Sequence, residues 1–145
     1  MFKKYTKLND YCNANIVEFE KDITSTGFFK NKAKYILATA IIIQKKFNGK
    51  IPETMNDLLS LPGVARKTAN VILGNAYNKI EGIAVDTHVR RFAIKFNLTD
   101  ARDPVIIEKN LMKLLPKKEW FSVTYRFIEY GRRFCPARKH YCNDH

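Results

Sequence analysis

The sequence has 145 residues, of which 46% are hydrophobic, enough for one modest domain or two small lobes with a buried core. Its 26 Lys and Arg against 14 Asp and Glu give a formal net charge of +12, which favours nucleic acid or an anionic membrane surface as partner, with a merely soluble basic protein as the alternative. The longest apolar run, residues 36–43, is too short to span a bilayer and no signal peptide opens the chain, so we expect a cytoplasmic protein without membrane contact.

Helical periodicity dominates the chain from its first third onward. Residues 31–47 carry apolar side chains around so much of the circumference that we predict a central core helix, buried on most sides and ended by Gly49. Pro52 opens a short helix that runs to Leu59 and leads into a tight turn at 61–65. Possible short strands at 82–85 have no pairing partner, so the predicted fold class is all-α.

The helix predicted after this turn, residues 66–77, has two distinct faces. An inward stripe is formed by Ala69, Ile72, Leu73 and Ala76. A second, small and polar face suits the wall of a cleft and is formed by Lys67, Asn70, Val71 and Gly74.

Residues 78–82 are predicted to form a loop, after which three more helices follow. Asp86 is the predicted N-cap of the first, which carries an apolar stripe to Phe96. Asp103 and Pro104 open the second, which extends to about Leu115. An apolar stripe beginning at Trp120 predicts the third.

Lys67 and Asp86 are the candidate catalytic residues. Lys67 lies one residue into its helix behind a glycine-bearing turn, and Asp86 follows at the start of another helix. An amine and a carboxylate placed in this way can perform Schiff-base chemistry on a sugar carbon. A tight turn before a helix also aims backbone amides at an anion, which makes the same segment a phosphate grip.

Four segments of the chain resemble the endonuclease III branch of the helix-hairpin-helix DNA glycosylases. They are LPGVARKTANVIL at 61–73, AVDTHV at 84–89, TGFFKNKAKYI at 26–36 and YGRRFCPARKHYC at 130–142. The resemblance implies a helix-hairpin-helix DNA glycosylase fold, with two helical lobes flanking a DNA-binding cleft. We expect residues 1–80, with the hairpin at about 53–77, to form one lobe and residues 81–145 the other.

The resemblance also assigns roles to individual residues. Lys67 would be the nucleophile, its ammonium form disfavoured by the helix N-terminus and by partial desolvation, and Asp86 would stabilise the charged sugar and move protons. Phe28 stands where the family presents an apolar wedge, although a core position is nearly as compatible with the sequence. The family usually has a glycine where this chain has Ala65, so a dihedral that glycine takes easily would have to be reached by alanine. The predicted DNA-binding residues are Leu61, Pro62, Gly63, Val64, Ala65, Arg66, Phe28, Lys30 and Arg90, with Lys32, Lys34 and Arg91 as further candidates.

The cysteines depart from the family pattern. Three cysteines in a chain without an export signal argue against a disulfide framework. Cys135 and Cys142 keep the first spacing of the family's iron-sulfur loop, but His145 takes the third ligand position and the fourth is lacking. A four-iron cluster takes four ligands, so we expect none within this incomplete loop, 135–145, and no cofactor is needed for the chemistry. A zinc site formed by Cys135, His140, Cys142 and His145 is the alternative.

These patterns predict a monomeric bifunctional DNA glycosylase with AP lyase activity that removes oxidised pyrimidines from double-stranded DNA in base excision repair. The partner would be duplex DNA with a damaged base or an abasic site, and the protein would be nucleoid-associated. The resemblance implies that an N-terminal helix and a helix with a gap-filling residue are absent, so we expect a shortened member or a fragment, weakly active alone. The alternatives are a non-catalytic helix-hairpin-helix DNA-binding fragment and a glycosylase of different lesion specificity.

Overall fold

The structure is a computed structural model that describes residues 3–138. These residues form α-helices and short 3₁₀ helices and contain no β-strand, which confirms the predicted all-α fold class. None of the described helices is long and apolar enough to cross a membrane. The chain divides into two compact units, Met1–Ala65 and Arg66–His145. This division falls earlier than the lobe boundary predicted after residue 80, and the two-lobe organisation stays a prediction.

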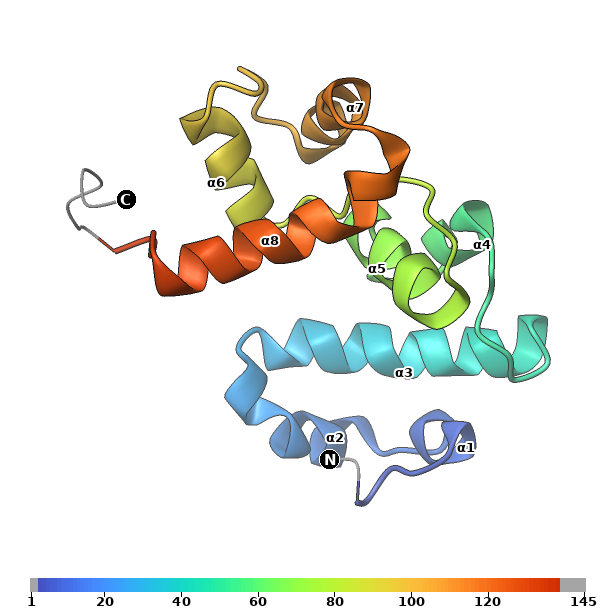
Figure 1. The fold of residues 1–145 in the computed structure, drawn as a ribbon. Helices are drawn as coiled ribbons and strands as arrows, with labels where there is room; N and C mark the ends of the chain where they lie inside the picture. Colours follow the sequence, from blue (N-terminus) through green and yellow to red (C-terminus); the bar gives the residue numbers. More distant parts are fainter. Residues whose placement is uncertain (1–2, 139–145) are drawn as a thin grey trace. The chain divides into compact units, whose positions relative to one another are not determined.

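The first unit is built on one long helix, α3 (Phe29–Lys46), against which α1 (Leu8–Cys12) and α2 (Ile16–Asp22) pack (Figure 1). A short 3₁₀ helix, η1 (Thr24–Thr26), joins α2 to α3, and α4 (Met55–Leu59) follows. The core beneath α1 and α2 consists of Tyr5, Phe19, Ile23, Ala33 and Leu37.

Helix α3 is less buried than its sequence predicts. Its buried residues are Ala33, Leu37, Ala40 and Ile43, which follow one another at helical spacing along a single face. Ile41 lies off that face and is 38% exposed. The prediction of a helix buried on most sides was therefore wrong, because an apolar side chain at the surface was counted as evidence of burial.

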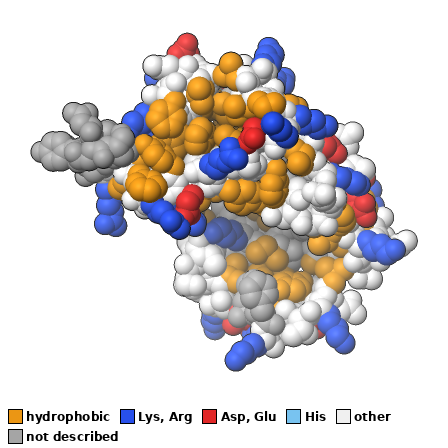
Figure 2. Space-filling model, in the orientation of Figure 1, with side chains coloured by type: hydrophobic (Ala, Val, Ile, Leu, Met, Phe, Trp, Pro, Cys, Tyr) orange, Lys and Arg blue, Asp and Glu red, His pale blue; other side chains and the backbone are white. Residues whose placement is uncertain are grey.

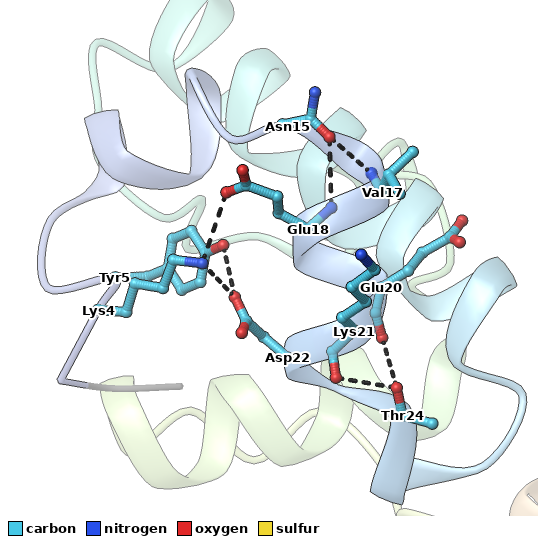
Figure 3. A network of polar contacts seen from close by, with 9 residues as sticks. All are labelled: Lys4, Tyr5, Asn15, Val17, Glu18, Glu20, Lys21, Asp22 and Thr24. Atoms are coloured by element: carbon cyan, nitrogen blue, oxygen red, sulfur yellow. Dashed lines mark hydrogen bonds and ion pairs between the residues drawn. The ribbon is translucent and has the colours of Figure 1, made fainter.

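A polar network ties the N-terminal segment of the first unit to α2 (Figure 3). The Lys4 amine donates to Asp22 Oδ2 at 2.8 Å and lies 3.6 Å from Glu18 Oε2. The Tyr5 hydroxyl donates to the same Asp22 oxygen at 2.9 Å. The hydrogen bond from Lys4, and to a smaller extent that from Tyr5, holds the pKa of the Asp22 carboxyl below its usual value.

We expect replacement of Asp22 to make the stability of the protein less dependent on acid pH. A carboxyl with a lowered native pKa stabilises the fold above its unfolded pKa, about 3.9, and this stabilisation is lost as the pH falls through the native value. The urea midpoint of Asp22→Asn should therefore be lower than that of the wild type at neutral pH, and the two should converge in acid. Glu20→Gln is the control, because the Glu20 carboxylate makes no hydrogen bond within residues 3–138. A gap that persists in strong acid would contradict the assignment.

The second unit contains α5 (Arg66–Tyr77), α6 (Thr87–Lys95), α7 (Pro104–Leu114), η2 (Lys117–Glu119) and α8 (Trp120–Arg133). Helix α6 packs against both α7 and α8. The core gathers apolar residues from these helices and from the buried segment that precedes α6: Ile83, Val85, Val89, Ala93, Ile107, Leu111 and Val123. Side chains of the predicted stripe on α8, including Trp120 and Phe127, pack against this core.

Helix boundaries in both units are set by local polar groups. The Asp86 and Asp103 side chains accept hydrogen bonds from backbone amides at the starts of α6 and α7, which confirms Asp86 as the predicted N-cap and the predicted helix start at Asp103 and Pro104. Asn48, Asn78 and Asn97 follow α3, α5 and α6 in the left-handed conformation, which asparagine tolerates better than most residues.

Candidate active site and DNA-binding residues

The turn before α5 is shaped by the first unit. Gly63 has a φ of +75°, and a Cβ at this position would lie 2.9 Å from the Tyr35 side chain. The Thr39 hydroxyl donates to the Pro62 carbonyl oxygen at 3.0 Å, while the buried Leu61 accepts from the Val64 amide at 3.2 Å. Both the backbone conformation and the close approach of Tyr35 require glycine at position 63.

Ala65 does not carry the strain that the sequence suggested. The non-glycine residues with positive φ among those described are Phe28, Asn48, Asn78 and Asn97, so Ala65 keeps an ordinary backbone conformation. Its side chain is exposed. The expectation that alanine must reach a dihedral favoured by glycine was therefore wrong, because within this turn only Gly63 takes a positive φ.

Lys67 lies in the first turn of α5, directly after the Gly63 turn in the chain. Its side chain is exposed, and within residues 3–138 its amine makes no hydrogen bond or ion pair. The partial desolvation expected from the sequence is thus not supplied by the described protein residues. The amine is nevertheless available, because no carboxylate in this range holds it.

Asp86 caps α6 with one carboxylate oxygen and leaves the other uncommitted. Oδ1 accepts from the amides of His88 and Val89 at 2.9 and 2.8 Å. No donor from residues 3–138 contacts Oδ2. The carboxylate is only partly buried and belongs to the same compact unit as Lys67. It can therefore keep its structural bonds while the second oxygen takes part in chemistry.

The helix face predicted to be a cleft wall is partly covered by protein. Asn70 is only 6% exposed, and its amide nitrogen donates to Glu108 Oε1 at 2.8 Å. A Cβ on Gly74 would lie 2.6 Å from the Phe121 ring. Two of the four residues of this face are thus packed against protein, whereas Lys67 is exposed and Val71 is half-buried, so the cleft wall stays a prediction.

Arg66 forms an ion pair with the buried Glu108. Its Nε and Nη2 atoms donate to Glu108 Oε2 and Oε1 at 2.7 and 2.9 Å. This carboxylate raises the pKa of the guanidinium further above its usual value. The Glu108 side chain is 3% exposed and the Arg66 side chain 37%, so water reaches the arginine but hardly the carboxylate.

Sequence reasoning missed Glu108. The signal was present, since Glu108 lies three and four residues before Leu111 and Met112, so it shares a helix face with core residues, where a charged side chain implies a buried partner.

Phe28 stands out from the first unit. It is 88% exposed and takes a φ of +48° immediately after Gly27, while the neighbouring Phe29 packs against the core. The alternative of a core position for Phe28 was therefore wrong.

Lys30 and Arg90 are also exposed, whereas the Lys32 amine donates to the Thr26 carbonyl. Figure 2 shows Lys and Arg side chains scattered among hydrophobic and uncharged ones.

Cys135 is the one predicted metal ligand that lies among the described residues. It is 1% exposed, and its sulfur lies 3.2 Å from Lys95 Nζ and 3.6 Å from Arg91 Nη1. Within residues 3–138 no group of three or more His, Cys, Asp or Glu could hold a metal ion. His140, Cys142 and His145 lie outside these residues. Cationic donors suit a thiolate, but one described ligand does not define a cluster, and the expectation of no four-iron cluster stays a prediction.

The family model described as "HhH-GPD superfamily base excision DNA repair protein" matches residues 1–117. The chain belongs to the HhH-GPD superfamily. It is 44% identical to endonuclease III of Synechocystis sp. over 99% of this chain, and 38% identical to endonuclease III of Bacillus subtilis over 98%. The HhH-GPD chain spans 66% and 65% of the length of these two relatives.

Solved structures show the same similarity. The structure titled "Structure of a non-covalent Endonuclease III-DNA Complex" superimposes with a TM-score of 0.92 and 38% identity, covering 99% of this chain and 67% of that chain. A second, titled "Structure of a Trapped Endonuclease III-DNA Covalent Intermediate: Estranged-Adenine Complex", has the same TM-score and identity. The predicted endonuclease III resemblance and the HhH-GPD fold are thereby confirmed.

Proposed function

We propose that this HhH-GPD protein is a bifunctional DNA glycosylase with AP lyase activity that removes oxidised pyrimidines from duplex DNA. The observation that carries the proposal is the pair formed by Lys67, whose exposed amine has no protein partner within residues 3–138, and Asp86, whose Oδ2 is likewise uncommitted there. The two residues stand within the motifs that resemble endonuclease III. Its relatives bear that name, and one structural neighbour is a trapped covalent intermediate with DNA.

In the proposed reaction, the damaged nucleotide first leaves the base stack, because no side chain reaches its sugar inside a duplex. The neutral Lys67 amine then attacks C1′, and the glycosidic bond breaks with its electron pair leaving on the base, which takes up a proton. Asp86 Oδ2 would stabilise the positive charge that develops on the sugar and accept the proton lost by the amine. Bound DNA would supply the desolvation that the exposed Lys67 lacks.

The lyase step follows from the covalent bond to Lys67. Opening of the sugar ring gives an imine between Nζ and C1′, with O4′ protonated. The imine acidifies the C2′ proton, and its removal drives β-elimination, in which the C3′–O3′ bond breaks and the 3′ phosphate departs. Hydrolysis of the remaining imine by water then releases Lys67.

DNA binding would use the backbone of the Gly63 turn together with exposed cations. Leu61, Pro62, Gly63, Val64 and Ala65 would present amides to a phosphate, with Lys30 and Arg90 as further phosphate contacts. Arg66 would contribute through the guanidinium hydrogens that Glu108 does not use. The exposed Phe28 would fill the space opposite the extruded base. Such a protein would act at the nucleoid, as a monomer.

A 5′-labelled duplex with one dihydrouracil tests this proposal. We expect cleavage at the lesion that leaves the product of β-elimination, with no cleavage of the matched undamaged duplex. If the protein is folded by circular dichroism and binds DNA but cleaves neither duplex, it is instead a DNA-binding module without turnover. Release of the base without strand cleavage would contradict the lysine mechanism.

A further inference from the structure

Glu108 lies at the centre of a buried network that none of the proposed chemical steps uses. Its carboxylate accepts three hydrogen bonds, two from Arg66 and one from Asn70, at 2.7 to 2.9 Å. All three donors belong to α5, the helix that carries Lys67. Glu108 itself is on α7 and is 2% exposed. A carboxylate is rarely buried to this degree unless it is fully paired.

The network also reaches the segment that leads to Asp86. Asn70 Nδ2 donates to the Ile83 carbonyl oxygen at 3.3 Å as well as to Glu108. A Cβ at Gly82 would lie 2.1 Å from Glu108 Oε1, so the backbone passes directly over the carboxylate. Residues 83–85 are buried between this point and the α6 N-cap. Glu108 is therefore linked to the elements that carry both proposed catalytic residues.

Arg66 and Asn70, which anchor α5 to Glu108, fix the direction in which Lys67 projects from the helix. Arg66 and Asn70 are four residues apart, so they lie on the same face of the helix, one turn from each other. Lys67 projects about 100° around the axis from Arg66. Hydrogen bonds from these two residues, a turn apart, to one buried carboxylate oppose rotation and sliding of α5. The planar fork of Arg66 adds a fixed orientation at the first residue of the helix.

A role in stability alone accounts poorly for this arrangement. Well-packed apolar side chains often stabilise a fold as much as a buried ion pair does. We propose that Glu108 is a positioning residue that, through Arg66, Asn70 and the Ile83 carbonyl, holds the first turn of α5 and the approach to Asp86 in register for imine formation. The inference rests on the function proposed above. It assigns Glu108 no contact with DNA.

The test compares Glu108→Gln with the wild-type protein on DNA with an abasic site. In Glu108→Gln an amide N–H faces the Arg66 donors, so the fork is broken while the side chain keeps its size. We expect the single-turnover rate of borohydride-trapped imine formation to fall by about 10- to 100-fold. Affinity for a tetrahydrofuran analogue, which cannot form an imine, should fall by much less than the rate, because Arg66 would supply only one of several proposed contacts to DNA. The rate of imine formation should keep the midpoint of its pH dependence and be lower at every pH, because the substitution changes the geometry and not the ionisation of the Lys67 amine.

Two further variants keep the test decisive. Glu119→Gln makes the same chemical change at an acid that pairs with Arg126 at 2.7 Å, outside the α5 network, and should leave the trapping rate unchanged. Asn70→Ala keeps the Arg66 ion pair and removes one anchor, so it should lower the rate by a smaller factor. If Glu108→Gln fails to fold, Asn70→Ala decides. A folded Glu108→Gln with the wild-type rate, or a rate loss matched by an equal loss of affinity, would overturn the proposal.

Amide hydrogen exchange separates this inference from the proposed function. The amides of residues 70–73 bond to carbonyls of the first turn of α5, so loosening of that turn should speed their exchange in Glu108→Gln relative to α8. This result would support the positioning role even if the wild-type chain trapped no DNA, which would count against the proposed function alone. Unchanged exchange in residues 70–73 would overturn the positioning role, whatever the activity.

Discussion

Replacement of Lys67 by alanine is expected to abolish strand cleavage at abasic sites by β-elimination. The variant removes the amine that would attack C1′, and the first turn of α5, residues 66–69, contains no other lysine. A loss of at least about 1000-fold is expected when a covalent nucleophile is deleted. Gel analysis of a 5′-labelled abasic duplex in single turnover would measure it. DNA affinity should be nearly kept, since backbone amides of the Gly63 turn supply the phosphate contact.

Lys79→Ala is the matched control for this experiment. It removes one positive charge from the same compact unit, in the loop after α5 and away from the first turn of that helix. Its cleavage rate should equal that of the wild type at the same salt concentration. If Lys67→Ala and Lys79→Ala lost cleavage equally, the loss would reflect charge and not a nucleophile.

Replacement of Asp86 by asparagine is expected to lower base excision strongly with little change in DNA affinity. The change removes a negative charge that would act mainly as positive charge develops on the sugar, which makes a loss of about 100- to 1000-fold reasonable. Asparagine is a good N-cap and can still accept the amides of His88 and Val89. The fold of α6 should therefore persist. Excision of dihydrouracil, measured with binding to a tetrahydrofuran duplex, gives both quantities.

Asp103→Asn provides the comparison, because Asp103 caps α7 with the same geometry. Its Oδ1 accepts from the amides of Val105 and Ile106 at 2.9 and 3.1 Å. A purely structural role for Asp86 predicts equal effects of the two substitutions on stability and on excision. Parallel losses of binding and excision in Asp86→Asn would point to damage of α6 rather than to lost chemistry.

Local signals explain why much of the fold could be predicted from the sequence. Asp86 and Asp103 marked helix starts because an N-cap acts on amides two and three residues away. The 66–77 helix has the predicted bounds for a similar reason, since the turn before it and Asn78 after it are adjacent in the chain. Helices α1 and α2 have short and irregular apolar patterns and were not predicted.

The candidate site was predictable only where a motif marks it. Lys67 and Asp86 were found from the residues around them, whereas the Glu108 network depends on pairs separated by 38 and 42 positions. The sequence of α5 alone does not indicate that Arg66 and Asn70 bind the same carboxylate on α7. Tertiary packing likewise decided which of Phe28 and Phe29 is exposed, because both fit the same local pattern.

Peptide mapping of the borohydride-reduced complex tests the central claim most directly. The protein would be reacted with duplex DNA containing one abasic site, reduced, digested with nuclease and protease, and analysed by tandem mass spectrometry. We predict that the residual deoxyribose adduct lies on Nζ of Lys67, in the peptide that follows the Gly63 turn. An adduct on any other lysine, on the N-terminal amine, or spread over several amines would contradict the assignment of Lys67 as the nucleophile.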